Sequence, residues 1–285
     1  MGSRRRRIAS SLRRAPLISL TIIVTVGLSA ILADSIAPYS PYEISLENSL
    51  QPPFWQGGGS LAHPLGTDSL GRDLLSRMIY GARVSLAAAF LTIVLGGAIG
   101  TVVGLLSGYL GGRLDMILMR VTDATLAFPI ILMALLLAVA LGPSFINVVI
   151  AIVVVLWSRY ARVIRGEVLS LKGLDFIAQA RITGCSPLRI MVRHLLPNVQ
   201  NTLVVLLTLQ VGWVIVVEAT LSFLGAGIPP PTPAWGSMVA DGRAYILSAW
   251  WTCTLPALAI LITVLSFNLF GDWLRDTLDP RLRQV

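Results

Sequence analysis

Long apolar runs constrain this chain more than any single motif does. A helix needs about 20 mostly apolar residues to cross roughly 30 Å of hydrocarbon. Only 13% of the residues are charged, whereas a soluble domain carries about 25%. We therefore expect one all-α transmembrane domain. The six candidate spans are residues 16–37, 84–108, 121–141, 144–160, 199–224 and 251–273.

The basic residues predict the orientation of these spans. If the N-terminus is cytoplasmic, the outer segments hold few of the 22 basic residues, namely Arg72, Arg77, Arg83 and Arg243. Because cytoplasmic segments are enriched in Lys and Arg, both termini are predicted to lie inside. The expected parts are a cytoplasmic Arg-rich tail (1–15), a first membrane anchor (16–37), an extracytoplasmic loop (38–83), a helical core (84–274) and a cytoplasmic tail (275–285).

This topology argues against an enzyme. It places Cys185 inside and Cys253 near the outer face, and it separates His63 from His194 in the same way, so neither a disulfide nor a shared metal site is expected. A P-loop needs a lysine before Ser or Thr, but the only lysine, Lys172, precedes glycine. Metal, nucleophilic and nucleotide chemistry all lack the residues they require.

The extracytoplasmic loop is turn-rich in its first half and amphipathic in its second. Asp73 and Arg77 there have the i,i+4 spacing of an ion pair. We expect a helix that lies on the membrane surface or on neighbouring spans. Its apolar residues at helical spacing are Leu70, Leu74, Leu75, Met78 and Ile79.

The loop at residues 165–198 carries the signals of two short helices. Asp175 is a plausible N-cap for the first, and Gly184 stands where a left-handed C-cap would be. Ser186 is the predicted N-cap of the second, with Pro187 at its first position. Pro197 is expected to stop that helix.

The second helix of this loop has an apolar stripe. Its residues occupy positions i, i+3, i+4 and i+7, which form one face. The stripe consists of Leu188, Met191, Val192 and Leu195. Two helices around a glycine could dock in the groove of a soluble partner or lie at the membrane surface without one. The residues alone favour neither alternative.

Two features lie inside the predicted spans. Gly96, Gly100, Gly104 and Gly108 form a ridge suited to close approach by another helix. Glu218, with Gln210 two turns earlier, either lines a polar pathway or makes a structural hydrogen bond, since a carboxylate in lipid faces a cavity or a partner.

Several motifs in order resemble the C-type permease subunits of peptide/nickel importers of the ATP-binding-cassette class. The outer loop contains HPLGTDSLGRD (63–73), followed by SR (76–77) and YGAR (80–83). Further along are LSFLG (221–225) with Pro229, Pro230, Trp235, Gly236 and Met238, then GDWLRD (271–276) and LDPRL (278–282). The resemblance covers the chain from His63 to the C-terminus and implies a six-helix type I importer permease with cytoplasmic coupling helices.

The resemblance also implies that the loop at 165–198 is the family's ATPase-coupling motif, E-A-A-x-x-x-G. Here residues 178–184 read AQARITG, so Ala178 replaces the glutamate and Gln179 the first alanine. The residues expected to couple to the ATPase are Ala178, Gln179, Ala180, Arg181, Gly184, Ser186, Leu188, Arg189, Met191, Val192 and Leu195.

The family further implies the partners. A homologous permease would complete the pathway, cytoplasmic ATPases would bind ATP and Mg, and an extracytoplasmic binding protein would deliver a di- or oligopeptide to residues 38–83 and 225–236. This chain would bind no cofactor and no nucleic acid, and would lie in a prokaryotic cell membrane. Nickel or a glutathione-type ligand is an alternative substrate.

A self-sufficient channel or secondary transporter is the alternative class of protein. A secondary transporter is expected to contain inverted repeats, whereas the glycine ridge occurs in only one half of this chain.

Overall fold

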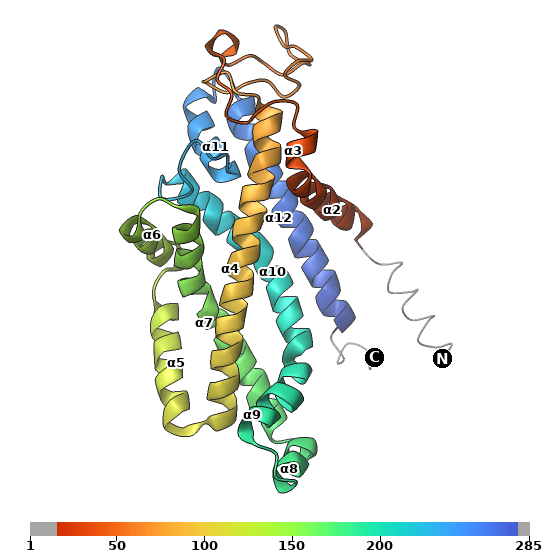
Figure 1. Ribbon diagram of the computed structural model, residues 1–285, viewed down its shortest axis with the longest axis vertical. Helices are drawn as coiled ribbons and strands as arrows, with labels where there is room; N and C mark the ends of the chain where they lie inside the picture. The colour runs from red at the N-terminus through yellow and green to blue at the C-terminus, as the bar shows by residue number, and fades with distance from the viewer. Residues whose placement is uncertain (1–15, 279–285) are drawn as a thin grey trace, which may run out of the picture.

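The structure is a computed structural model that describes residues 16–278 of the 285. The predicted tail at 1–15 and the end of the tail at 275–285 lie outside these residues. The described chain contains no β-strand, only an isolated bridge between Thr67 and Asp73, and forms an elongated helical bundle (Figure 1). The all-α prediction is confirmed. The helices are α2 (Leu17–Ile31), α3 (Ala33–Ile36), η1 (Leu46–Asn48), α4 (Leu74–Leu110), α5 (Gly112–Ala127), α6 (Ile130–Leu141), α7 (Phe145–Lys172), α8 (Asp175–Ile182), α9 (Pro187–Ile190), the π-helical turn η2 (Met191–Leu195), α10 (Leu196–Phe223), α11 (Trp235–Gly242), η3 (Arg243–Tyr245) and α12 (Trp251–Leu278).

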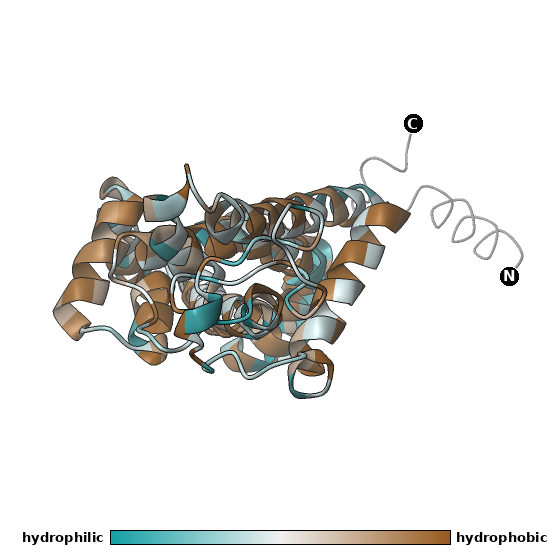
Figure 2. Ribbon diagram, turned by 90° about the horizontal axis from the view of Figure 1, so that it is seen from above, coloured by the Kyte–Doolittle hydropathy of each residue, from teal (hydrophilic) through white to brown (hydrophobic). Residues whose placement is uncertain are grey.

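Four described helical segments are long and apolar enough to cross a membrane. They are α4, α7, the continuous segment Pro187–Phe223, and α12. The bent pair α5–α6 forms a fifth candidate, whereas α2 has 15 residues and is shorter than the anchor predicted at 16–37. Apolar residues cover much of the outside of the bundle when it is seen from above (Figure 2). This distribution is that of a protein whose solvent is lipid.

The third predicted span is not one straight helix. The chain bends by 93° between α5 and α6. Phe128 is extended there (φ −81°, ψ 142°), and Pro129 follows it. Proline disfavours helical backbone at the preceding residue and has no N–H to donate. The prediction of a continuous span at 121–141 is therefore wrong, and Pro129 is the physical reason.

The glycine ridge packs α4 against α7, as predicted. A Cβ added at Gly104 would lie 2.8 Å from the Cβ of Ile164, and one at Gly108 would lie 2.8 Å from the Cβ of Val168. Distances this short are not found between real side chains, so the two backbones approach as closely as they do only because these positions lack side chains. The pair forms the central spine of the bundle.

The predicted amphipathic helix of the outer loop is not a separate element. Its apolar residues from Leu74 onward belong to the first turns of α4, which continues without interruption to Leu110. Asp73 caps this helix by accepting a hydrogen bond from the backbone N–H of Ser76. Leu74 is buried and packs with Trp235 of α11 and Trp251 of α12, so the start of α4 lies on neighbouring helices, which is the second of the two expected positions.

Candidate functional site

The loop at residues 165–198, which is predicted to be cytoplasmic and is called the cytoplasmic loop below, lies at one end of the bundle, where α8 and α9 protrude beyond the spans (Figure 1). Gly184 has φ +79°, the left-handed conformation predicted for a C-cap. The N–H of Cys185 donates to the carbonyl of Ala180 at 3.0 Å, and that of Gly184 donates to Arg181 at 3.0 Å. These bonds close the end of α8 and reverse the chain. Asp175 is the first residue of α8 and makes no capping hydrogen bond, so its predicted capping role is wrong.

The second helix begins as predicted but does not end as predicted. The Ser186 hydroxyl accepts a hydrogen bond from the N–H of Arg189 at 3.4 Å, with Pro187 at the first helical position. Pro197 does not stop the helix, because the π-helical turn η2 leads directly into α10. The wider i→i+5 turn accommodates a proline that would clash with a carbonyl of the preceding α-helical turn. Asn198, one residue further along, donates its side-chain N–H to the carbonyl of His194 at 2.6 Å.

The predicted apolar stripe divides between two environments. Met191 and Leu195 are buried, and they pack with Ile190 in the inner core cluster of the protein. Leu188 and Val192 are 67% and 54% exposed. The expectation that all four residues form one docking face is therefore wrong. Two of them hold the loop to its own bundle, and two remain available to a partner.

The other predicted coupling residues divide in the same way. Ala180 is buried. Ile182, which the prediction did not include, is 85% exposed beside the turn, and its apolar character next to the Gly184 turn is the signal that could have identified it. The exposed members of the predicted set are Ala178, Gln179, Arg181, Gly184, Ser186, Leu188, Arg189 and Val192. The tip of the loop is thus apolar and basic.

Cationic side chains join this loop to the inner end of α4. Lys172, the last residue of α7, donates from Nζ to the carbonyl of Tyr109 at 2.5 Å and lies 3.5 Å from that of Gly108. The guanidinium of Arg181, on α8, lies 5.4 Å from the centre of the Tyr109 ring. A cation at the C-terminus of a helix satisfies carbonyls that have no partner within the helix. The orientation of α8 is thereby tied to that of α4.

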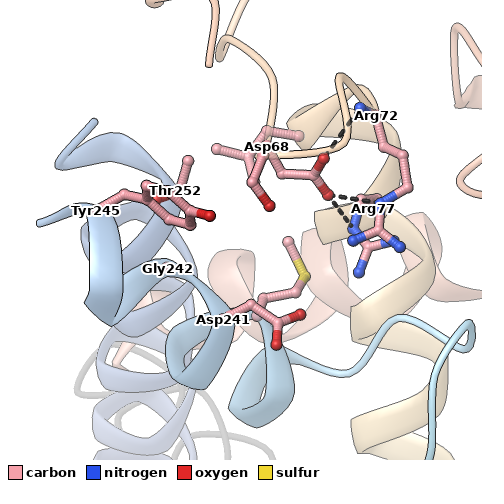
Figure 3. A pocket seen from close by; sticks show the side chains of 10 residues that line it. Asp68, Arg72, Arg77, Asp241, Gly242, Tyr245 and Thr252 are labelled. Atoms are coloured by element: carbon pink, nitrogen blue, oxygen red, sulfur yellow. Dashed lines mark hydrogen bonds and ion pairs between the residues drawn. The ribbon is translucent and has the colours of Figure 1, made fainter. Parts of the chain in front are cut away.

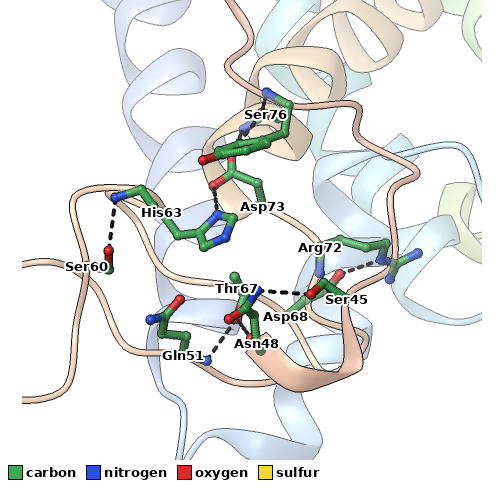
Figure 4. A network of polar contacts seen from close by, with 12 residues as sticks. Ser45, Asn48, Gln51, Ser60, His63, Thr67, Asp68, Arg72, Asp73 and Ser76 are labelled. Atoms are coloured by element: carbon green, nitrogen blue, oxygen red, sulfur yellow. Dashed lines mark hydrogen bonds and ion pairs between the residues drawn. The ribbon is translucent and has the colours of Figure 1, made fainter.

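At the opposite end, the outer loop is closed by a polar network around Asp73 (Figure 4). The Asp73 carboxylate accepts from the N–H and the hydroxyl of Ser76 at 2.8 and 2.7 Å, and lies 3.0 Å from Nδ1 of His63. Trp251 of α12 donates from Nε1 to the carbonyl of Thr67 at 3.1 Å. These bonds anchor the loop to α4 and α12.

A second outer cluster centres on Asp68 (Figure 3). Its carboxylate lies 2.7 Å from Nε of Arg72 and 3.3 Å from Nε of Arg77. The predicted ion pair between Arg77 and Asp73 is therefore wrong, because Arg77 reaches Asp68 and the carbonyl of Pro41 instead. A cavity of about 20 Å³ separates this cluster from α11 and α12. The cluster braces the outer loop against α11, whose Asp241 lines the same cavity.

Inside the bundle, the carboxylate of Glu218 accepts from the hydroxyls of Ser222 and Ser85 at 2.8 and 3.2 Å. Its side chain is fully buried between α10 and α4. This geometry matches the structural hydrogen-bond alternative for Glu218. Gln210 lies on the same helix and is partly exposed. The pathway role of both residues stays a prediction.

Comparisons with known proteins agree with this architecture. A family model described as "Binding-protein-dependent transport system inner membrane component" matches residues 100–284. A second, described as "N-terminal TM domain of oligopeptide transport permease C", matches residues 12–53.

Similar proteins extend over nearly the whole chain. The dipeptide transport system permease protein DppC of Haemophilus influenzae is 44% identical over 271 residues, which are 95% of this chain and 92% of that protein. The protein of the same name in Escherichia coli K12 is 45% identical, with 95% and 90% covered. Among solved structures, the MetNI methionine ABC transporter in an inward-facing conformation matches 72% of this chain and 98% of its own with a TM-score of 0.59 and 19% identity, which shows the fold alone.

Proposed function

This chain belongs to the family of binding-protein-dependent transport system inner membrane components, and we propose that it is the permease subunit of an ATP-driven importer of di- and oligopeptides. The observation that carries this proposal is the 44–45% identity to dipeptide permeases over 95% of the chain. Similarity over this length includes both ends of the membrane domain as well as the short motifs. The chain is a multi-pass inner membrane protein, and the proposed orientation has both termini cytoplasmic.

The cytoplasmic loop is the proposed contact with an ATPase subunit. Its support is the exposure of Ile182, Leu188 and Val192 at the tip of the bundle, beside the exposed Arg181 and Arg189. Apolar anchors surrounded by cations suit a groove with an acidic rim. Since Ala178 carries no charge, the proposed contact is apolar at its centre and does not depend on an acid from this chain.

The remaining partners follow from the same proposal. A homologous permease chain would supply the other half of the pathway. ATP and Mg would be bound by the ATPase subunits, and this chain would bind no cofactor. An extracytoplasmic binding protein would deliver the peptide to the outer surface formed by residues 38–83 and 225–236.

The proposal can be tested with the complete complex in proteoliposomes. Uptake of dialanine should require ATP on the ATPase side, the sister permease and the loaded binding protein. Transport by this chain alone, driven by an ion gradient, would overturn the proposal.

A single substitution tests the docking surface. Leu188→Asp should leave the complex inserted but reduce dialanine uptake per ATP hydrolysed by on the order of tenfold, because it places a charge in a desolvated contact. The matched control is Leu247→Asp, which makes the same change at a fully exposed position on the outer side. Equal uptake in both variants would refute the docking role.

A further inference from the structure

Arg159 has an unusual position for an arginine. It lies at the middle of α7 (Phe145–Lys172), about 20 Å from either end at 1.5 Å per residue. The ring of Trp213, which lies beside its guanidinium, belongs to the interior of α10 (Leu196–Phe223). Both helices belong to membrane-spanning segments. The next residue, Tyr160, packs on Gly100 within the apolar run 84–108 of α4. We therefore infer that Arg159 lies at the depth of the hydrocarbon, where a cation is costly unless it faces a cavity, a pathway or a partner.

The contacts of Arg159 differ from those of the other arginines on the same helix. Arg162 pairs with Asp123, and Arg165 pairs with Asp115 through two hydrogen bonds of 2.6 and 2.7 Å. Within residues 16–278, Arg159 has no ion pair and no hydrogen bond. Its guanidinium carbon lies 4.6 Å from the centre of the Trp213 ring.

This contact stabilises the cation without occupying its hydrogen bonds. An aromatic face attracts a guanidinium through the ring quadrupole, and the attraction is stronger where water is excluded. The five N–H groups of an arginine remain donors that need acceptors. Arg159 is only partly buried, so these donors are accessible from outside the chain.

The neighbouring surface is suited to a polar ligand. Gln210 precedes Trp213 by three residues on α10, so both lie on one face of that helix, and both are partly exposed. An amide, an indole and an unpaired guanidinium thus lie at one level between α7 and α10. Lipid offers no acceptor at this depth.

We propose that Arg159, held by Trp213, binds the carboxylate of the transported peptide midway through the membrane. The guanidinium is a planar fork that matches a carboxylate with two parallel hydrogen bonds. Every linear peptide with a free C-terminus carries such a carboxylate, whatever its side chains. The inference rests on the proposed function and specifies the chemical group that its pathway recognises.

The test uses the complete complex in proteoliposomes with saturating binding protein. The substrates are dialanine and dialanine amide, which differ only in the terminal carboxylate. Because the binding protein can itself select against the amide, each variant is compared with the unaltered complex on the same compound. Arg159→Gln should lower the maximal rate of dialanine uptake by on the order of tenfold or more and leave the rate of amide uptake unchanged. Arg159→Lys should retain part of the dialanine rate.

Arg162→Gln is the matched control, because it removes one positive charge from α7 at an exposed position. It should leave uptake of both compounds unchanged. A second measurement does not depend on delivery of the amide. With Cys185 and Cys253 replaced by Ser, Gln210→Cys should react with a water-soluble maleimide, since the face beside Arg159 borders an aqueous pathway.

Three results would overturn the inference while leaving the proposed function intact. The first is an unchanged rate of dialanine uptake in Arg159→Gln. The second is an equal loss of uptake for both compounds, which would assign Arg159 to packing or to a carboxylate of the sister chain. The third is a Gln210→Cys variant that does not react with the maleimide. Absence of ATP-dependent uptake of either compound by the unaltered complex would instead overturn the proposed function, and the inference with it.

Discussion

The glycine ridge predicts that equal substitutions along one helix have opposite effects. A Cβ at Gly100 would lie 2.5 Å from the Cβ of Tyr160 and would also meet the carbonyl oxygen of Trp157. The nearest atom to a Cβ at Gly96 is 3.5 Å away, at the end of the Leu156 side chain, which is ordinary contact. Gly100→Ala must therefore separate α4 from α7, whereas Gly96→Ala need not.

The magnitudes follow from two opposing terms. Overpacking a well-packed interface costs about 1–3 kcal/mol, and replacing glycine by alanine within a helix recovers about 1 kcal/mol. We expect Gly100→Ala to be destabilising by up to about 2 kcal/mol in net terms. Gly96→Ala should be neutral or stabilising by up to about 1 kcal/mol, as should Gly166→Ala, where nothing lies within 4 Å of the added carbon.

The protein carries a suitable reporter of its own unfolding. Cys253 is buried, whereas Cys185 is partly exposed, so a thiol-reactive fluorophore in a Cys185→Ser background reports exposure of the core on heating. Gly100→Ala should lower the midpoint of unfolding by on the order of 5 °C relative to Gly96→Ala. Equal midpoints for these two variants would refute the argument that backbone approach, and not helix propensity, decides the effect.

Three further predictions concern the ends of the bundle. Asp73→Ala removes the cap of α4 and leaves the N–H of Ser76 unpaired, so it should lower stability by about 1–3 kcal/mol in the same thermal assay, and Asp73→Asn, which keeps an acceptor, should cost less. Lys172→Met frees the last carbonyls of α4, and we expect faster hydrogen–deuterium exchange in the final turn of that helix, with unchanged exchange at its outer end as the control. Met191→Asp buries an unpaired charge and should prevent stable folding, whereas the same change at the exposed Leu188 should leave the unfolding midpoint in place; similar midpoints would contradict the division of the stripe.

Much of the architecture could be predicted because membrane helices have strong local signals. The lengths of the apolar runs predict the four membrane-spanning segments α4, α7, Pro187–Phe223 and α12. The spacing of the glycines predicts that α4 packs closely against another helix, which is α7. The caps at Gly184 and Ser186 were also correct, because cap geometry depends on a few adjacent residues. These features need no knowledge of distant parts of the chain.

The errors have a common physical origin in contacts between distant segments. All four apolar residues at 188–195 recur at the spacing of one helix face. The sequence does not say that α4 and α7 bury two of them, Met191 and Leu195, in the fold. Arg77 has an acid at the favourable i−4 position, yet Asp68 is held closer by the fold of the loop. The fourth apolar run is predicted to end at Tyr160, whereas helix α7 continues to Lys172, because contacts with α4 and α5 support its polar half.

The length of α4 has a mechanical consequence. With 37 residues it is about 55 Å long at 1.5 Å per residue, whereas the hydrocarbon core is about 30 Å thick. One end is fixed in the outer network at Asp73, and the other is held by Lys172 beside the cytoplasmic loop. A stiff rod of that length, tilted by about 10° around its midpoint, displaces its two ends by about 5 Å in opposite directions. A displacement of the cytoplasmic loop would therefore move the outer surface through rotation of α4 as a rigid body, without passing step by step through intervening side chains.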